Sequence, residues 1–224
     1  MKAMILAAGL GTRMRPLTDH TPKPLLEAGG KPLIVWHIER LRAAGISELV
    51  INHAWLGDKL EAALSDGSAF GVDIAWSREG DPLETAGGIQ KALPLLGNEP
   101  FLVVNGDIWT DIDFAALALA EEDLAQLVLV DNPAHNPDGD FHLASDGKVR
   151  DNTTLHKLTF SGVGLYRPAL FTGLDAGESK LAPLLRQAME KDAVTGIHHR
   201  GHWWDIGTPE RLDQLDRFLR THTL

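Results

Sequence analysis

The sequence predicts an α/β protein with a doubly wound, mostly parallel sheet and a mixed, partly antiparallel C-terminal half. Two observations carry this prediction. Short apolar runs alternate with amphipathic stretches through the first half of the chain, which is typical of right-handed βαβ units whose strands are covered on both faces. In the second half, hairpin-like turns and shorter extended runs replace that alternation. The first half is therefore expected to be Rossmann-like.

The elements of the first half follow one another regularly. Each expected strand is a short apolar run, and each expected helix has apolar residues three or four positions apart. In chain order we expect strand 3–8, helix 33–45, strand 48–54, helix 56–67, strand 72–79, helix 84–97 and strand 100–108.

The second half is less regular. We expect strand 125–133, a hairpin over 141–151, strand 159–168, helix 181–192, extended segments over 194–206 and helix 208–222. The hairpin turns at Asp146-Gly147, and the two extended segments meet at Gly201. The last helix has Thr208 as its N-cap and Pro209 at its first position. No Pro/Gly/Ser-rich linker interrupts the chain, so residues 1–224 are predicted to form one domain.

Composition excludes several classes of function. The chain has no cysteine, and therefore no disulfide, no thiol nucleophile and no Cys-ligated zinc. The net charge of −10 argues against a nucleic-acid surface. The apolar run at the N-terminus ends in Gly after a few residues, too short for a signal peptide or a membrane span. We expect a cytoplasmic protein that binds neither nucleic acid nor membrane.

The segment after the first strand is unusual in length and in charge. Residues 9–24 are rich in Gly, Pro and Thr, and residues 1–42 carry seven Lys and Arg against three Asp and Glu. Long loops inside compact domains are usually functional. The run Gly9-Leu10-Gly11-Thr12-Arg13 suits a phosphate cradle, although it matches neither the P-loop nor the dinucleotide fingerprint. A structural turn with chance clustering of charge is the alternative.

Four ordered motifs make the longer pattern specific. They are GLGTRMRPLTDHTPKPLL at 9–26, LETAGGI at 83–89, VVNGDI at 103–108 and WWDIGTPERL at 203–212. Together they resemble the signature of the sugar-phosphate nucleotidyltransferases over essentially the whole chain. The resemblance implies a glycosyltransferase-A-like nucleotidyltransferase fold, with a nucleotide-binding half at about 1–114 and a sugar-binding half at about 115–224.

The resemblance also implies a reaction. An oxygen of a sugar-1-phosphate attacks the α-phosphorus of a nucleoside triphosphate, and pyrophosphate leaves. Both reactants are anions, so the protein must supply positive charge and alignment. Gly11, Thr12 and Arg13 would hold the β and γ phosphates, and Arg13 and Lys23 would be the catalytic cations. The alternative for Lys23 is a solvated lysine in a loop.

Two carboxylates are implied as ligands of Mg²⁺. Asp107 ends a buried strand within Asn-Gly-Asp, and Asp205 lies in Trp-Trp-Asp-Ile-Gly. Mg²⁺ typically takes one or two carboxylates together with substrate phosphates. The alternatives are turn capping by Asp107 and an ion pair of Asp205 with Arg200.

Other residues are implied to contact the base and the sugar. In relatives the LETAGG segment helps to hold the nucleobase, which implicates Glu79 and Gly88; this chain has Glu84 where the commoner motif has Gly. For the sugar phosphate the resemblance implicates Asn105, Asp140 and Asn152. Asp140 is alternatively a plain turn residue. The Glu-Lys-Pro element found in many relatives is missing here, which leaves Asn152 a weaker candidate.

Within the family, two stretches resemble a narrower group. Residues 103–114 and 135–143 are most like the uridylyltransferases that act on N-acetylmuramate α-1-phosphate, which implies UTP as the donor. The lactyl carboxylate of that sugar would need a donor, and charge alone suggests His142, Arg150 and Lys157. Two other interpretations stay open: a sister enzyme with another nucleotide and sugar, and a non-catalytic sensor of nucleotide sugars. The sequence does not indicate an oligomeric state.

Overall fold

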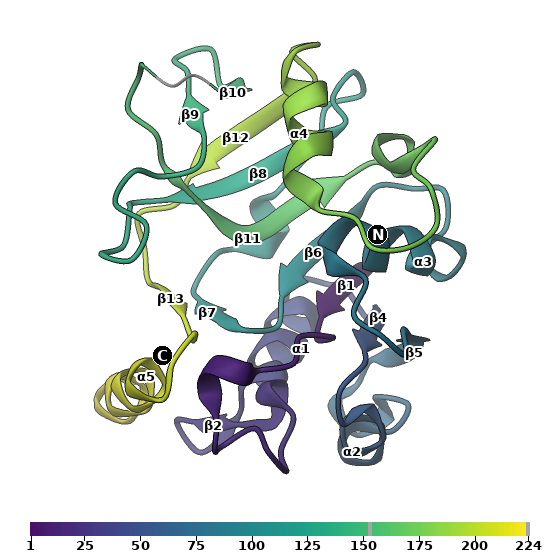
Figure 1. The fold of residues 1–224 in the computed structure, drawn as a ribbon, viewed down its shortest axis with the longest axis vertical. Helices are drawn as coiled ribbons and strands as arrows, with labels where there is room; N and C mark the ends of the chain where they lie inside the picture. The colour runs from purple at the N-terminus through teal and green to yellow at the C-terminus, as the bar shows by residue number, and fades with distance from the viewer. Residues whose placement is uncertain (152–153, 223–224) are drawn as a thin grey trace.

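A seven-stranded sheet with the order β12-β8-β11-β6-β1-β4-β5 forms the centre of the protein (Figure 1). The computed structural model describes residues 1–151 and 154–222. The strands of this sheet are β1 (Ala3–Leu6), β4 (Glu48–His53), β5 (Asp73–Arg78), β6 (Phe101–Asn105), β8 (Ala125–Val130), β11 (Thr159–Tyr166) and β12 (Val194–His198). Strand β11 runs antiparallel to β6 and β8, whereas the other neighbours are parallel. The predicted mostly parallel sheet, with its antiparallel part in the second half, is confirmed.

Helices cover both faces of this sheet, as a doubly wound fold requires. The helices are α1 (Leu33–Ala43), α2 (Gly57–Leu64), α3 (Glu84–Leu96), α4 (Leu181–Met189) and α5 (Pro209–Thr221). Apolar residues of α1 and α2, such as Ile38 and Leu60, pack in one buried cluster. Residues of α3 and α4, such as Ile89 and Leu185, belong to a second cluster on the opposite face. The predicted helices are therefore all present.

Several short elements complete the fold. They are the pairs β2 (Glu27–Ala28) with β3 (Lys31–Pro32), β7 (Ile108–Thr110) with β13 (Trp203–Asp205) and β9 (His142–Leu143) with β10 (Val149–Arg150), and the 3₁₀ turns η1 (Thr12–Met14), η2 (Lys23–Leu25), η3 (Ser68–Phe70), η4 (Phe114–Ala116) and η5 (Pro168–Phe171). The hairpin of β9 and β10 lies where the sequence predicted it. The pairing of β7 with β13 was not predicted.

The C-terminal helix α5 returns to the N-terminal segment. Met14, Trp109 and Leu215 share a third buried cluster that joins η1, β7 and α5. The backbone N–H of Gly29 donates to the side chain of Asp216 over 2.9 Å, which fixes the position of α5 against β2. Thr208 caps this helix as predicted, its side chain accepting from the N–H of Arg211. Over the described ranges, no helix has the length and apolar character needed to cross a membrane.

Candidate active site

The site lies at the carboxyl ends of β1 and β6, neighbouring strands of the sheet. Leu6 and Asn105 are register partners, so the segments that follow these strands start side by side. The N–H of Gly106 donates to the carbonyl of Leu6 over 2.8 Å. A Cβ on Gly106 would lie 2.6 Å from that oxygen, so glycine is required for this close approach. Strand order changes direction at this point, where open α/β sheets bind ligands.

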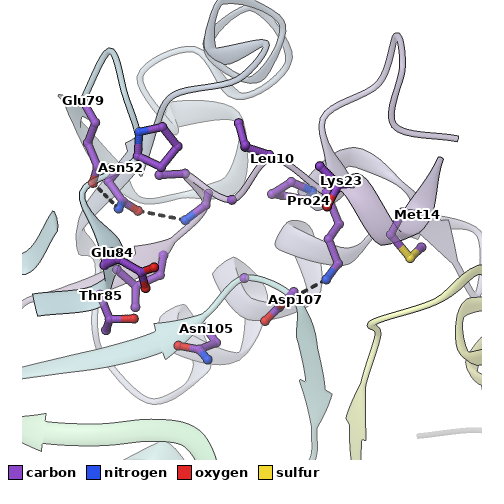
Figure 2. A pocket seen from close by; sticks show the side chains of 18 of the residues that line it. Leu10, Met14, Lys23, Pro24, Asn52, Glu79, Glu84, Thr85, Asn105 and Asp107 are labelled. Carbon is purple, nitrogen blue, oxygen red and sulfur yellow. Dashed lines mark hydrogen bonds and ion pairs between the residues drawn. The ribbon is translucent and has the colours of Figure 1, made fainter. Parts of the chain in front are cut away.

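The glycine-rich segment forms one wall of a cavity of about 610 Å³ (Figure 2). Gly11 has φ +64°, a left-handed conformation that glycine adopts readily. The hydroxyl of Thr18 donates to the carbonyl of Gly11 over 2.7 Å and holds this turn in place. Thr12 and Arg13 follow in η1, are exposed and line the cavity. The glycine-rich segment and Arg13 therefore border the same cavity.

An ion pair at the larger cavity joins η2 to the segment that follows β6. Lys23 Nζ lies 2.9 Å from Oδ2 of Asp107 (Figure 2). Lys23 is buried along its stem, whereas the side chain of Asp107 is 40% exposed. An ammonium has three donors, so Lys23 can contact phosphate oxygens and Asp107 together. The alternative of a solvated lysine does not describe this residue.

A buried histidine fixes the strand that follows Asp107. His37, on α1, donates from Nε2 to the carbonyl of Ile108 over 2.9 Å. Burial lowers the pKa of His37 to about 4, because the interior disfavours the charged imidazolium; the hydrogen bond to Ile108 opposes this only in part. His37 is therefore neutral near pH 7 and serves to position β7.

The short strand β13 brings Asp205 beside Asp107. Asp205 is the register partner of Ile108, and the N–H of Ile206 donates to the carbonyl of Asp107 over 2.9 Å. The two carboxylates implied as metal ligands are thus on adjacent backbone segments, although 98 positions separate them in the sequence. Asp107 lines the cavity and Asp205 lies just behind its rim at Gly207.

Asp205 has two basic side chains as partners, and they differ from the one considered in the sequence. Arg211 Nη1 lies 2.6 Å from its Oδ2, and His135 Nε2 lies 3.0 Å from the same oxygen. Among the described residues, Arg200 forms no ion pair with Asp205, whereas Arg211, in the first turn of α5, does. A Cβ on Gly207 would lie 3.2 Å from Arg13 Nη1 and 3.1 Å from Arg211 Nη1, so cations converge there.

A polar network joins β4 to the wall formed by the LETAGG motif. Asn52 Oδ1 accepts from the N–H of Ala7 over 2.8 Å, and Asn52 Nδ2 donates to Glu79 Oε1 over 2.6 Å (Figure 2). Glu79 Oε2 accepts from the N–H of Leu83 over 2.9 Å. Asn52 and Glu79 both line the cavity. Asn52 was not predicted from the sequence, although a polar amide near the end of the apolar run of β4 could have indicated a site residue.

Gly88 lies behind this network rather than in the cavity lining. It is buried in α3, and a Cβ there would lie 2.5 Å from Glu79 Oε1 and 3.0 Å from Asn52 Nδ2. The absence of a side chain at Gly88 is therefore what admits the Asn52–Glu79 hydrogen bond. Its predicted contact with the nucleotide stays a prediction.

A second cavity of about 300 Å³ adjoins the first and shares Glu84, Thr85 and Asn105 with it. Asp140 lines this smaller cavity, and its Oδ2 accepts from the N–H of Phe160 over 2.8 Å. The side chain of Asp140 therefore holds β11 in position. The alternative of a plain turn residue does not describe this contact. Asn152 lies outside the residues that the structure describes.

Glu84 stands between the two cavities in a left-handed backbone conformation, with φ +58°. A side chain at positive φ costs about 1–2 kcal/mol, which glycine avoids. The left-handed backbone at position 84 explains why the commoner form of the LETAGG motif has glycine there. In this chain a carboxylate occupies the junction instead (Figure 2).

The family follows from comparison with known proteins. The family model described as "Nucleotidyl transferase" matches residues 2–148, well over half of the chain. The chain belongs to the nucleotidyltransferase family. A Bacillus anthracis crystal structure, described as a putative glucose-1-phosphate thymidylyltransferase, covers all of this chain and 97% of its own with a TM-score of 0.85; at 22% identity it shows the fold alone.

Curated relatives of this nucleotidyltransferase match more than 90% of its length. An N-acetylmuramate alpha-1-phosphate uridylyltransferase of Neisseria meningitidis is 60% identical and covers 96% of both chains. A protein of the same name from Caulobacter vibrioides is 35% identical over 93% of this chain and 92% of its own. A mannose-1-phosphate guanyltransferase of Aspergillus oryzae is 30% identical, and the match spans 62% of that protein.

The predicted site residues of the nucleotidyltransferase are distributed around the two cavities. Those that line the larger cavity are Gly11, Thr12, Arg13, Lys23, Glu79, Asn105 and Asp107. Asp140 lines the smaller one, whereas Gly88 and Asp205 lie directly behind the walls. Their roles toward substrates and metal stay predictions. Across residues 1–151 and 154–222, no group of three or more His, Asp or Glu side chains is placed to hold a metal ion.

Proposed function

We propose that this nucleotidyltransferase transfers a uridylyl group from UTP to N-acetylmuramate α-1-phosphate, giving UDP-N-acetylmuramate and pyrophosphate. The observation that carries the proposal is 60% identity, over 96% of both chains, to a Neisseria meningitidis protein named for this activity. Guanyltransferases are more distant, at about 30% identity over part of their length. We further propose that the reaction occurs in the cytoplasm and serves peptidoglycan recycling.

The two adjoining cavities suit a two-substrate transfer. The larger one, with its glycine-rich wall and Arg13, would hold the triphosphate, and the smaller one would hold the sugar. Asn105 lies on the boundary, so the sugar phosphate would meet the α-phosphate beside Asp107. Lys23, oriented by Asp107, would contact oxygens of the reacting phosphates, and Arg13 would stabilise the charge on the departing pyrophosphate.

Mg²⁺ is the cofactor that these residues fit. Within the described chain, the side-chain hydrogen bonds and ion pairs of Asp107 and Asp205 involve Oδ2, and no hydrogen-bond partner contacts Oδ1 of either. One or two carboxylates with phosphate oxygens and water are the usual ligands of Mg²⁺. Asp107 and Asp205 would hold the ion. When bound, it would neutralise charge on the phosphates.

The test is pyrophosphate release in the presence of Mg²⁺, measured for UTP, dTTP, CTP, GTP and ATP. Each nucleotide is paired with N-acetylmuramate-, N-acetylglucosamine-, glucose- and mannose-1-phosphate, and mass spectrometry identifies the products. The proposal expects turnover with UTP and N-acetylmuramate-1-phosphate, lost with EDTA and restored by Mg²⁺. Turnover confined to another pair would replace these substrates and keep the reaction class. Nucleotide binding without turnover would favour a sensor.

A further inference from the structure

The smaller cavity contains two cations that no motif of the family singled out. Lys180 and Arg186 line it together with the carboxyl side chains of Glu84 and Asp140. Carboxylates are suited to sugar hydroxyls, whereas cations are suited to an anion. A neutral pyranose offers no charge to a cation, so a cation at this wall that forms no ion pair within the protein would suit a sugar that carries a negative charge besides its phosphate.

Lys180 is held at the cavity by the backbone that precedes it. Ser179 accepts hydrogen bonds at its carbonyl from the N–H groups of Ala86 (2.9 Å) and Gly87 (3.1 Å), and its own N–H donates to the carbonyl of Leu83 (3.0 Å). These bonds attach the segment to the first turn of α3. The same helix contributes Glu84 and Thr85, which line both cavities. Lys180 follows immediately, as the first residue before α4 (Figure 1).

Of the two cations, Lys180 is the one with its charge available. Arg186 Nε lies 2.7 Å from Asp151 Oδ2. In the described part of the chain, no carboxylate lies within ion-pair distance of Lys180, which is exposed. Its ammonium therefore retains donors for a ligand.

The cations suggested by charge alone are committed elsewhere. Arg150 forms two hydrogen bonds with Asp146, of 3.0 and 2.8 Å, and Lys157 Nζ lies 3.2 Å from Asp151. The ring of His142 contacts the carbonyl of His156 over 2.7 Å. None of these three is among the residues that line the smaller cavity.

We propose that Lys180 binds the lactyl carboxylate of the sugar and so selects N-acetylmuramate over neutral amino sugars. This inference rests on the proposed function and adds a specificity residue to it. A charge-assisted hydrogen bond of this kind corresponds to roughly a 10- to 100-fold difference in binding.

The experiment compares wild type with Lys180→Gln at saturating UTP. The KM for N-acetylmuramate-1-phosphate is measured by pyrophosphate release, and N-acetylglucosamine-1-phosphate, which lacks the lactyl group, is measured as a competitive inhibitor. We expect the KM to rise about 10- to 100-fold, with the inhibition constant and kcat unchanged. Lys180→Arg should keep most of the selectivity. Lys191→Gln, an exposed lysine beyond the end of α4, is the control and should change neither value.

Each outcome has a distinct meaning. An equal weakening of both sugars by Lys180→Gln would place Lys180 at the shared phosphate or ring and overturn the inference alone. No effect on either sugar would overturn it as well. If wild type does not use N-acetylmuramate-1-phosphate but turns over another sugar phosphate, the proposed function fails, and this inference fails with it.

Discussion

Substituting Gly88 by Ala tests whether the space at this glycine is reserved for the Asn52–Glu79 hydrogen bond. In a helix interior, Ala is about 1 kcal/mol more favourable than Gly. Here the new Cβ would lie 2.5 Å from Glu79 Oε1 and displace it. Losing a buried hydrogen bond to a carboxylate costs about 1.5–3 kcal/mol. We therefore expect Gly88→Ala to lower the free energy of unfolding by about 1 kcal/mol in net terms.

The same substitution should have the opposite sign once Glu79 is removed. In a Glu79→Ala background the contact with Oε1 is gone, and Asn52 Nδ2, no longer held by Glu79, can move away from the new Cβ. Gly88→Ala should therefore stabilise the protein by up to about 1 kcal/mol. The four proteins form a double-mutant cycle with an expected coupling of about 2 kcal/mol. Urea denaturation measures it, provided that the m-value stays constant. Stabilisation by Gly88→Ala to the same extent in both backgrounds would refute the reasoning.

Two further predictions concern stability. Burial lowers the pKa of His37 to about 4. Between pH 6.5 and 4 the unfolded chain therefore binds more protons than the folded one, and the free energy of unfolding falls as the pH falls through this window. From pH 7 to pH 5, the free energy of unfolding measured by urea denaturation should drop by about 2 kcal/mol more in wild type than in His37→Gln. Parallel pH profiles of the two proteins would contradict this. At Glu84, where φ is +58°, Glu84→Gly should be about 1 kcal/mol more stable than Glu84→Ala in thermal unfolding, because only glycine relieves the left-handed strain; equal stabilities would contradict it.

The sequence predicted those parts of the fold that depend on local pattern. Alternating apolar runs and amphipathic stretches placed the strands and helices, and Thr208 with Pro209 marked the start of α5. Because β1 and β6 are parallel neighbours, the glycine-rich segment and Asp107 follow their carboxyl ends at the same edge of the sheet. The sequence showed that Glu84 replaces the commoner glycine, and the positive φ at this position was found only in the structure.

Contacts between distant short segments were beyond the sequence pattern. Strands β7 and β13 have three residues each, too short for a periodic signal, yet their pairing is what brings Asp205 to Asp107. For the same reason Arg200 was considered as the partner of Asp205, whereas α5 presents Arg211. Lys180 was missed because it lies in no family motif, and its position depends on backbone bonds between Ser179 and α3.

Asp107→Asn tests whether Asp107 acts at the reacting phosphates. The substitution keeps the side-chain shape and a half-exposed position, so folding should be retained, as circular dichroism and thermal unfolding would check. The measurement is the rate of Mg²⁺-dependent pyrophosphate release from UTP with N-acetylmuramate-1-phosphate. We expect a folded protein whose turnover is lower than that of wild type by about 10²-fold or more. A rate near that of wild type would contradict it.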